Sequence, residues 1–243
     1  HCPSRVYRPH TTGIDMIYVP LSRTKVRMKK TIKWNLAQKA ERTWWQQYLK
    51  GKDVAAYHTW KRAYWDGILQ AIAQHVEIKP GMRILDAGCG PAGIFMELGN
   101  CEVDAVDPLL DMYSADLPHF KPEMYPYVTF HASPLEQYTA DKQYDVVFCM
   151  NAINHVSDIK LSYDLLTQMV KPGGILVVSI DAHNHGFFKH VFRLIPGDVL
   201  HPHQYDLQEY AAFITDRGFT LLQTLKLKHE FFFDHYVQVA RKN

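Results

Sequence analysis

The stretch from Ile84 to Phe95 combines residue types that point to ligand binding. Gly88, Gly90 and Gly93 form the G-x-G-x-x-G spacing of a turn that brings the backbone close to a nucleotide. In a dinucleotide site, the pyrophosphate lies on the amides of such a turn and on the helix that follows. Asp86 stands two residues before the first glycine, where its carboxylate would repel a pyrophosphate. The glycines and the acid therefore indicate ligands of different charge.

A cationic ligand removes this conflict. S-adenosylmethionine carries an α-ammonium, a sulfonium and a ribose but no phosphate, so Asp86 can bind the ammonium, directly or through water, or brace the loop. A side chain at Gly88 or Gly90 would hold the ligand away from the backbone. Asp107 suits two ribose hydroxyls, although NAD sites use an acid in the same way. Asp86 therefore favours S-adenosylmethionine over NAD.

Alternating strand and helix patterns must position these residues. Apolar strands are expected at 82–87, 101–107, 127–132, 144–150 and 173–180. Helices are expected from the glycine turn to Leu98, from Pro108, over 158–170, and over 206–218 between an Asp206 N-cap and a Gly218 stop. Such β-α units predict parallel strands.

The end of the chain departs from this alternation. The segments 219–229 and 231–242 read as strands that are joined too tightly for a helical crossover, so they should pair antiparallel. The pattern predicts an α/β fold with a doubly wound, mostly parallel sheet and an antiparallel C-terminal hairpin. Ligands of such sheets bind beyond the carboxyl ends of the strands.

The composition excludes several classes of protein. With 243 residues and a formal net charge of +2, the chain has no strong overall attraction to nucleic acid. Its four cysteines form no C-x-x-C pair, and no apolar run approaches the roughly 18 residues of a membrane span. No signal peptide is visible. We therefore expect a cytoplasmic protein without a transmembrane segment.

Four segments in order resemble motifs of class I S-adenosylmethionine-dependent methyltransferases. The segment ILDAGCGPAG resembles motif I, and VDAVD resembles the acidic motif that follows it. The segment YDVVFCMNAINHV resembles the fourth-strand motif, and VKPGGILVVS resembles the entry to the fifth strand. The resemblance covers about residues 55–243, implies a seven-stranded sheet, and is loosely nearest to small-molecule enzymes of the quinone-pathway type. One departure is that Ala92 occupies the usual glycine position, with Gly93 displaced by one.

The resemblance also implies where the cofactor and its product, S-adenosylhomocysteine, would bind. The glycine loop would contact the methionine part, and Asp107 would contact the ribose. The segment after the third strand would contact the adenine, and the residues after the fourth strand would lie beside the methyl donor. The expected cofactor-binding residues are Asp86, Gly88, Cys89, Gly90, Asp107, Pro108, Ala132, Ser133, Leu135, Met150 and Asn151.

Histidines and aromatic residues are the candidates for the acceptor side. His155 follows the fourth strand and is a candidate general base, or it caps its loop or touches the cofactor. His201 and His203 end a histidine-rich stretch; His203 is a second candidate base and His201 a substrate contact. Their H-x-H spacing lacks a third ligand, so we expect no metal. Trp60 and Tyr64 are expected to form an aromatic wall for the acceptor, or to pack the helices.

The N-terminal third is expected to differ from the rest of the chain. Residues 1–33 have no hydrophobic period and should be a disordered basic tail, and whether 1–27 belong to the native protein stays open. Helices are expected over 35–50 and 53–78, with Asp53 as an N-cap. We therefore expect a tail (1–33), an aromatic-rich helical lid (34–78) and a Rossmann-like methyltransferase domain (79–243).

The function that fits these observations is methyl transfer to a small-molecule acceptor, by in-line displacement with a possible histidine base. An RNA or protein methyltransferase is the alternative, although MNAINH lacks the proline-rich motif that grips an exocyclic amine, and no basic groove is evident. A non-catalytic cofactor-binding module and an NAD-dependent oxidoreductase are further alternatives. The acceptor, the methylated atom and the oligomeric state stay open.

Overall fold

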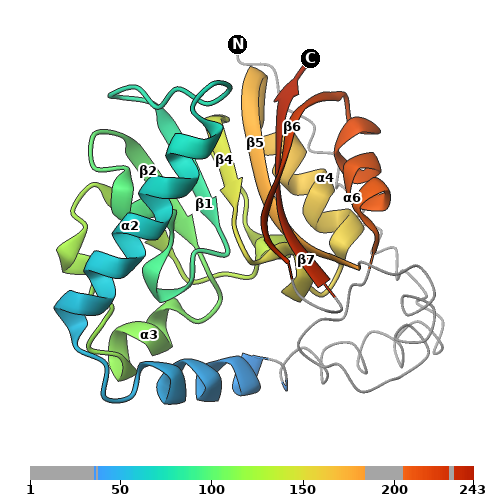
Figure 1. The fold of residues 1–243 in the computed structure, drawn as a ribbon. Helices are drawn as coiled ribbons and strands as arrows, with labels where there is room; N and C mark the ends of the chain where they lie inside the picture. The colour runs from blue at the N-terminus through green and yellow to red at the C-terminus, as the bar shows by residue number, and fades with distance from the viewer. Residues whose placement is uncertain (1–35, 37, 184–204, 230–232) are drawn as a thin grey trace, which may run out of the picture.

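A computed structural model describes residues 36, 38–183, 205–229 and 233–243 (Figure 1). Its seven strands form one sheet in the order β3-β2-β1-β4-β5-β7-β6, in which β1 to β5 are parallel and β7 is antiparallel to both neighbours. The strands are β1 (Arg83–Ala87), β2 (Glu102–Val106), β3 (Val128–His131), β4 (Tyr144–Cys149), β5 (Val170–His183), β6 (Phe219–His229) and β7 (Phe233–Lys242). This order confirms the predicted fold class. The strand order reverses between β1 and β4, which is where such sheets bind ligands.

The helices begin where capping side chains satisfy their first amides. Asp53 caps α2 (Val54–Ile72) by accepting from the amide of Ala56, and Asp206 forms a capping box with Glu209 at the start of α6. Gly218 follows α6 with a φ of +79°, as expected for a helix stop. The other helices are one over 38–49, α3 (Leu110–Asp116), α4 (Ile159–Met169) and α6 (Leu207–Thr215).

Two helix predictions were wrong in extent. The helix expected between the glycine turn and Leu98 is replaced by two short 3₁₀ turns, Gly90–Ala92 and Ile94–Glu97, because Gly93 between them is fully extended. The helix α2 ends at Ile72 and not at residue 78. Val76 is buried in the same core beyond the helix end, so the apolar pattern continued where the helix did not.

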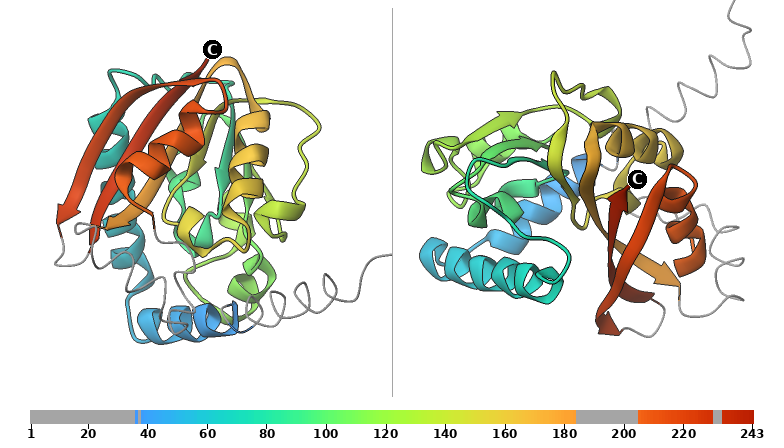
Figure 2. Two further views of the ribbon diagram at one scale, coloured as in Figure 1. Left: turned by 90° about the vertical axis from the view of Figure 1, so that its right-hand side faces the viewer. Right: turned by 90° about the horizontal axis from the view of Figure 1, so that it is seen from above.

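Helices cover both faces of the sheet (Figures 1 and 2). On one face, α2 packs Trp65, Ile68 and Ile72 in a common core with Val177 and Val237 of the sheet. On the opposite face, α4 and α6 share a second core with the alternate strand residues. Within the part of the chain that the structure describes, no helix has the length and apolarity that crossing a membrane would need.

The helix over 38–49 lies across the carboxyl ends of the strands (Figure 1). It is tied to α3 by a single carboxylate: Oδ2 of Asp116 accepts from Nη2 of Arg42 at 2.6 Å and from Nε2 of Gln46 at 3.0 Å. At the other side, the ring of Trp45 comes within 3.6 Å of where a Cβ on Gly90 would stand. The N-terminal helix therefore covers the glycine turn.

Candidate functional site

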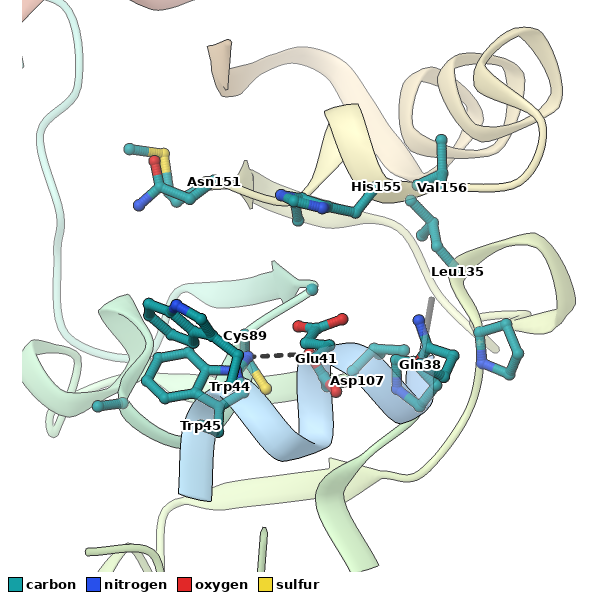
Figure 3. A pocket seen from close by; sticks show the side chains of 18 of the residues that line it. Gln38, Glu41, Trp44, Trp45, Cys89, Asp107, Leu135, Asn151, His155 and Val156 are labelled. Atoms are coloured by element: carbon teal, nitrogen blue, oxygen red, sulfur yellow. Dashed lines mark hydrogen bonds between the residues drawn. The ribbon is translucent and has the colours of Figure 1, made fainter. Parts of the chain in front are cut away.

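A cavity of about 480 Å³ lies between the N-terminal helices and the carboxyl ends of β1, β2 and β4 (Figure 3). The loops after β1, β2, β3 and β4 form one side of the cavity, and the helix over 38–49 and α2 form the other. Most of the residues expected from the sequence line it: Trp60, Gly88, Cys89, Gly90, Asp107, Pro108, Leu135, Met150, Asn151 and His155. Residues from six separate segments thus meet at one place.

Four of the expected site residues do not line the cavity, and two more lie outside the described residues. Ala132 and Ser133 do not line the cavity; the Ser133 hydroxyl donates to the carbonyl of Pro134, and Pro134 and Glu136 line it instead. Tyr64 and Asp86 also lie outside the lining. His201 and His203 fall outside the described residues.

Asp86 braces the glycine loop from beneath. Its side chain is buried, and Oδ2 accepts from the amide of Phe95 at 3.0 Å. Burial raises the pKa of Asp86 to about 7; the nearby Asp107 adds to the shift, while the Phe95 and Ile94 amides and Lys61 oppose it. These contacts support the bracing alternative, while a direct or water-mediated contact of Asp86 with the ligand stays a prediction.

The displaced glycine follows from this brace. A Cβ on Gly93 would lie 2.3 Å from Oδ2 of Asp86 and 2.6 Å from the carbonyl oxygen of Cys89. Gly93 leaves room for the carboxylate to reach the amides beyond it. On the other side of the loop, the indole N–H of Trp65 donates to the carbonyl of Ala92 at 3.0 Å, so α2 fixes the same turn.

Gly88 and Gly90 are needed for reasons within the protein. Gly88 has a φ of +73°, and a Cβ there would lie 2.2 Å from the Cβ of Ala152 in the loop after β4. Gly90 has a φ of +58°, a conformation that other residues rarely adopt. Close packing of two loops thus adds to the expected approach of a ligand as a reason for glycine.

Asp107 is held ready to accept hydrogen bonds from a ligand. Its Oδ2 accepts from the amide of Gly90 at 3.0 Å, and its Oδ1 accepts from the amide of Leu109 at 2.9 Å. A carboxylate offers about four lone-pair sites, so each oxygen can still accept once more. Burial raises the pKa of Asp107 to about 6, against the two amide bonds.

Asn151 holds a strained backbone at the end of β4. Its φ is +55°, in the left-handed region that a residue other than glycine seldom occupies. Ser179 stabilises it, since its hydroxyl oxygen accepts from the Asn151 amide at 2.6 Å and its hydroxyl donates to the Asn151 side chain at 3.0 Å. The Tyr64 hydroxyl also bonds to Asn151, so Tyr64 supports the site from outside the cavity. Such strain is characteristic of functional sites.

Among the charged residues of the cavity, sequence reasoning missed Glu136 after β3 and two residues on the helices, Lys61 and Glu41. The Lys61 ammonium lies 4.8 Å from the ring centre of Trp65 and 5.1 Å from that of Tyr64, and burial lowers its pKa to about 8. Burial and then Asp107 raise the pKa of Glu41 to about 7. Both residues stand on helices without a recognisable motif. Only the folded arrangement brings them to the strand ends.

His155 lines the cavity opposite the N-terminal helix (Figure 3). It ends the 3₁₀ turn Ile153–His155, and its amide donates to the carbonyl of Ala152 at 2.9 Å. The residue therefore stands on a short turn beside Asn151, at the carboxyl end of β4. Among the described residues, no group of histidines, cysteines and acids is arranged to hold a metal ion.

A family model described as a methyltransferase domain matches residues 57–224. The chain belongs to this family. This confirms the resemblance to class I S-adenosylmethionine-dependent methyltransferases, and with it the cofactor. The matched region begins within α2 and therefore excludes the helix over 38–49.

Curated relatives match only part of their own length. The ubiquinone biosynthesis O-methyltransferase of Rickettsia canadensis (strain McKiel) is 28% identical over 144 residues, which cover 58% of this chain and 59% of that protein. The mitochondrial ubiquinone biosynthesis O-methyltransferase of Mus musculus is 27% identical over 146 residues, which cover 56% of this chain and 40% of that protein. The chain thus spans less than two thirds of these relatives.

Solved structures share the fold. The magnesium protoporphyrin IX methyltransferase of Synechocystis PCC 6803, solved with bound S-adenosylhomocysteine, has a TM-score of 0.62 at 18% identity, covering 88% of this chain and 99% of that one. The [4+2]-cyclase SpnF has a TM-score of 0.57 at 15% identity, covering 73% of this chain and 80% of that one. The fold therefore carries more than one chemistry.

Proposed function

We propose that this protein transfers the methyl group of S-adenosylmethionine to a small molecule. The observation that carries the proposal is the single cavity in which the glycine loop, the anchored Asp107 and the strained Asn151 meet. The sulfonium supplies an electrophilic methyl group, and the protein has to hold the cofactor and the acceptor in line. The residues of the cavity fit these tasks.

The glycine loop and Asp107 would hold the two ends of the cofactor. The methionine part would lie along Gly88 to Gly90, and the ribose hydroxyls would donate to Asp107. Lys61 is a partly buried cation on the lining, so it would bind the α-carboxylate of the methionine part. The adenine would lie against Pro108 and Leu135.

The acceptor is proposed to be a hydroxyl group on a flat small molecule. The names of the matched relatives, which are O-methyltransferases, support oxygen as the acceptor atom. Trp44 and Trp60 line the cavity and remain about half exposed, so they offer aromatic surface at its rim. His155 would accept the hydroxyl proton. Roles for His201 and His203, and a cytoplasmic location, stay predictions.

The N-terminal helices would act as a lid over this site. The helix over 38–49 and α2 supply one wall of the cavity, and water excluded by their aromatic side chains cannot compete for the methyl group. The proposed division is the one expected from the sequence: a tail at 1–33, a lid at 34–78 and the methyltransferase domain at 79–243.

Two measurements test the proposal. Calorimetric titration should show binding of S-adenosylmethionine and S-adenosylhomocysteine and none of NAD. Incubation with methyl-labelled cofactor and a panel of hydroxylated aromatic compounds should then transfer label to at least one of them. Binding of NAD alone would overturn the cofactor assignment. Cofactor binding without transfer to any fraction of a cell extract would favour a non-catalytic module.

A further inference from the structure

The helix over 38–49 brings one acid into the cofactor cavity. Glu41 is the only acidic residue between 38 and 49, and it lines the cavity next to Asp107 (Figure 3). The two carboxyl groups lie close enough that Asp107 is the second cause, after burial, of the raised pKa of Glu41. Two acids from distant segments thus face one buried space.

No basic side chain in the described part of the chain pairs with these two acids, and the side chains of Trp45 and Tyr113 only partly oppose the rise in the pKa of Glu41. Neither Glu41 nor Asp107 forms an ion pair with a described residue. The amides of Gly90 and Leu109 each occupy one oxygen of Asp107 and leave its outward lone pairs unused. Asp107 is buried and Glu41 is partly buried, and holding two carboxylates close together without a cation is unfavourable. A partner that donates hydrogen bonds to both would therefore stabilise the arrangement.

A third polar group with unused capacity lies beside the pair. The side chain of Tyr113, on α3, is fully buried, and its hydroxyl makes no hydrogen bond of standard geometry with any described residue. Burial, and after it Asp107 and Glu41, raise the pKa of Tyr113, because its hydroxyl lies near both acids. One hydroxyl can donate to only one of the two carboxyl groups, so acceptor positions remain for a ligand that donates hydrogen bonds.

We propose that Glu41 is a second ribose ligand, so that the vicinal hydroxyls of the cofactor donate one to Asp107 and the other to Glu41. The proposal rests on the proposed function only in that the cavity binds S-adenosylmethionine. A vicinal diol has two donors, and two carboxylates on opposite sides can each accept one. Tyr113 would then donate to Glu41 and hold it in place.

The position of the helix makes this contact part of lid closure. Glu41 faces the cavity while its neighbour Arg42 points to Asp116 on α3 and is held there at 2.6 Å. The contact between Arg42 and Asp116 that holds the helix in place therefore also determines how far Glu41 reaches into the cavity. A ribose bound between Asp107 and Glu41 would connect the methyltransferase domain to the lid.

The test combines a substitution with matching changes in the ligand. Binding of S-adenosylhomocysteine and its 2′-deoxy and 3′-deoxy analogues is measured by calorimetry for the wild type, for Glu41→Gln and for Glu102→Gln. Glu102 is exposed at the first position of β2, at the opposite end from Asp107, so its variant loses the same charge far from the cavity. We expect Glu41→Gln to bind S-adenosylhomocysteine roughly 10-fold more weakly, and Glu102→Gln to bind like the wild type.

The analogues decide whether a ribose hydroxyl is the partner. For the analogue that lacks the hydroxyl bound by Glu41, wild type and Glu41→Gln should bind equally. An equal loss for all three ligands, or no loss for any, would overturn the role of Glu41 while leaving the cofactor assignment intact. Absence of S-adenosylhomocysteine binding to the wild type would overturn the proposed function itself. Should Glu41→Gln fail to fold, Glu41→Asp, which keeps the charge but withdraws the carboxylate, should show the same pattern.

Discussion

Asp86 and Gly93 together stabilise the glycine loop at the start of the site. The carboxylate reaches under the loop to the amide of Phe95, and the glycine leaves the space that it crosses. The sequence showed both residues, but their relation required the fold, because nothing in the spacing says that position 93 lies against position 86. The acid that suggested a cationic ligand supports the loop that would hold one.

Gly93→Ala should therefore destabilise the protein. The added Cβ would stand 2.3 Å from the Asp86 carboxylate, and we expect a loss of about 1–3 kcal/mol in the free energy of unfolding, measured in urea. Gly67→Ala is the matched control, since Gly67 lies within α2 with open space around its Cβ position. That variant should gain roughly 0.5–1 kcal/mol. Equal stability of the two variants would contradict the brace.

Asp86→Asn separates bracing from ligand binding. The amide oxygen of asparagine can still accept from the Phe95 amide, but the charge is gone. Because Asp86 lies outside the cavity lining, we expect the affinity for S-adenosylmethionine to stay within about twofold of the wild type. Calorimetry checks this, and a tenfold loss would restore a direct role for the carboxylate.

His155→Asn should lower turnover without weakening cofactor binding. If His155 accepts the proton of the acceptor, its loss should reduce kcat by roughly 100-fold or more, while the Kd for S-adenosylhomocysteine stays unchanged. The pH dependence of kcat should also lose its acidic limb. A variant that lost affinity for the cofactor but kept its turnover would assign His155 to cofactor binding.

At the scale of elements, the strands were the most predictable part. Each parallel strand is a short apolar run bounded by turn residues, and a strand buried on both faces needs little else. The elements that failed are those decided by tertiary contacts. The glycine turn leads into 3₁₀ turns because Gly93 is extended, and α2 stops before Val76 although Val76 belongs to its core. The chain after β3 turns Pro134 to Glu136 toward the cavity, so the contact of Ala132 and Ser133 with the cofactor stays a prediction.

Loosening the docked N-terminal helix should shorten the lifetime of the bound cofactor. Asp116 accepts from both Arg42 and Gln46, so Asp116→Ala removes the contact with α3. Exposed ion pairs contribute about 0–1 kcal/mol, so we expect little change in thermal stability but a several-fold faster release of S-adenosylhomocysteine. Stopped-flow tryptophan fluorescence can measure this rate. Asp111→Asn, on the exposed side of the same helix, is the control and should release the ligand at the wild-type rate.

At the scale of the whole molecule, three acids with raised pKa values lie in or beside one cavity. Asp86 and Glu41 have pKa values raised to about 7, and that of Asp107 is raised to about 6. An acid whose pKa is raised by folding stabilises the native state below its unfolded pKa, and that stability is lost as the pH rises through the folded value. The pKa of Lys61 is lowered to about 8, so Lys61 affects stability at higher pH. Its unfavourable effect on the native state disappears as the pH rises from about 8 toward 10.5, the pKa of the unfolded state.

Thermal unfolding without cofactor should therefore depend on pH in a defined direction. We expect a higher Tm at pH 5 than at pH 7.5, by roughly 5 °C, because the three acids lose their protons over this interval. Glu41→Gln should reduce this difference by removing one of the three. Melting curves by circular dichroism check both points, and a Tm that rises between pH 5 and 7.5 would contradict the assigned shifts.

The helix over 38–49 lies outside the residues that the methyltransferase-domain model matches, yet it supplies Gln38, Glu41, Trp44, Trp45 and Tyr48 to the cavity. One wall of the binding surface is thus encoded by a separate stretch of chain, while the loops of the sheet encode the opposite wall. Substitutions in this helix can reshape what the cavity accepts without changing the strands. A chimaera that carries the corresponding helix of a relative should keep the fold and change the ligand preference. This short segment is therefore where substitutions can alter ligand preference with the smallest effect on the fold.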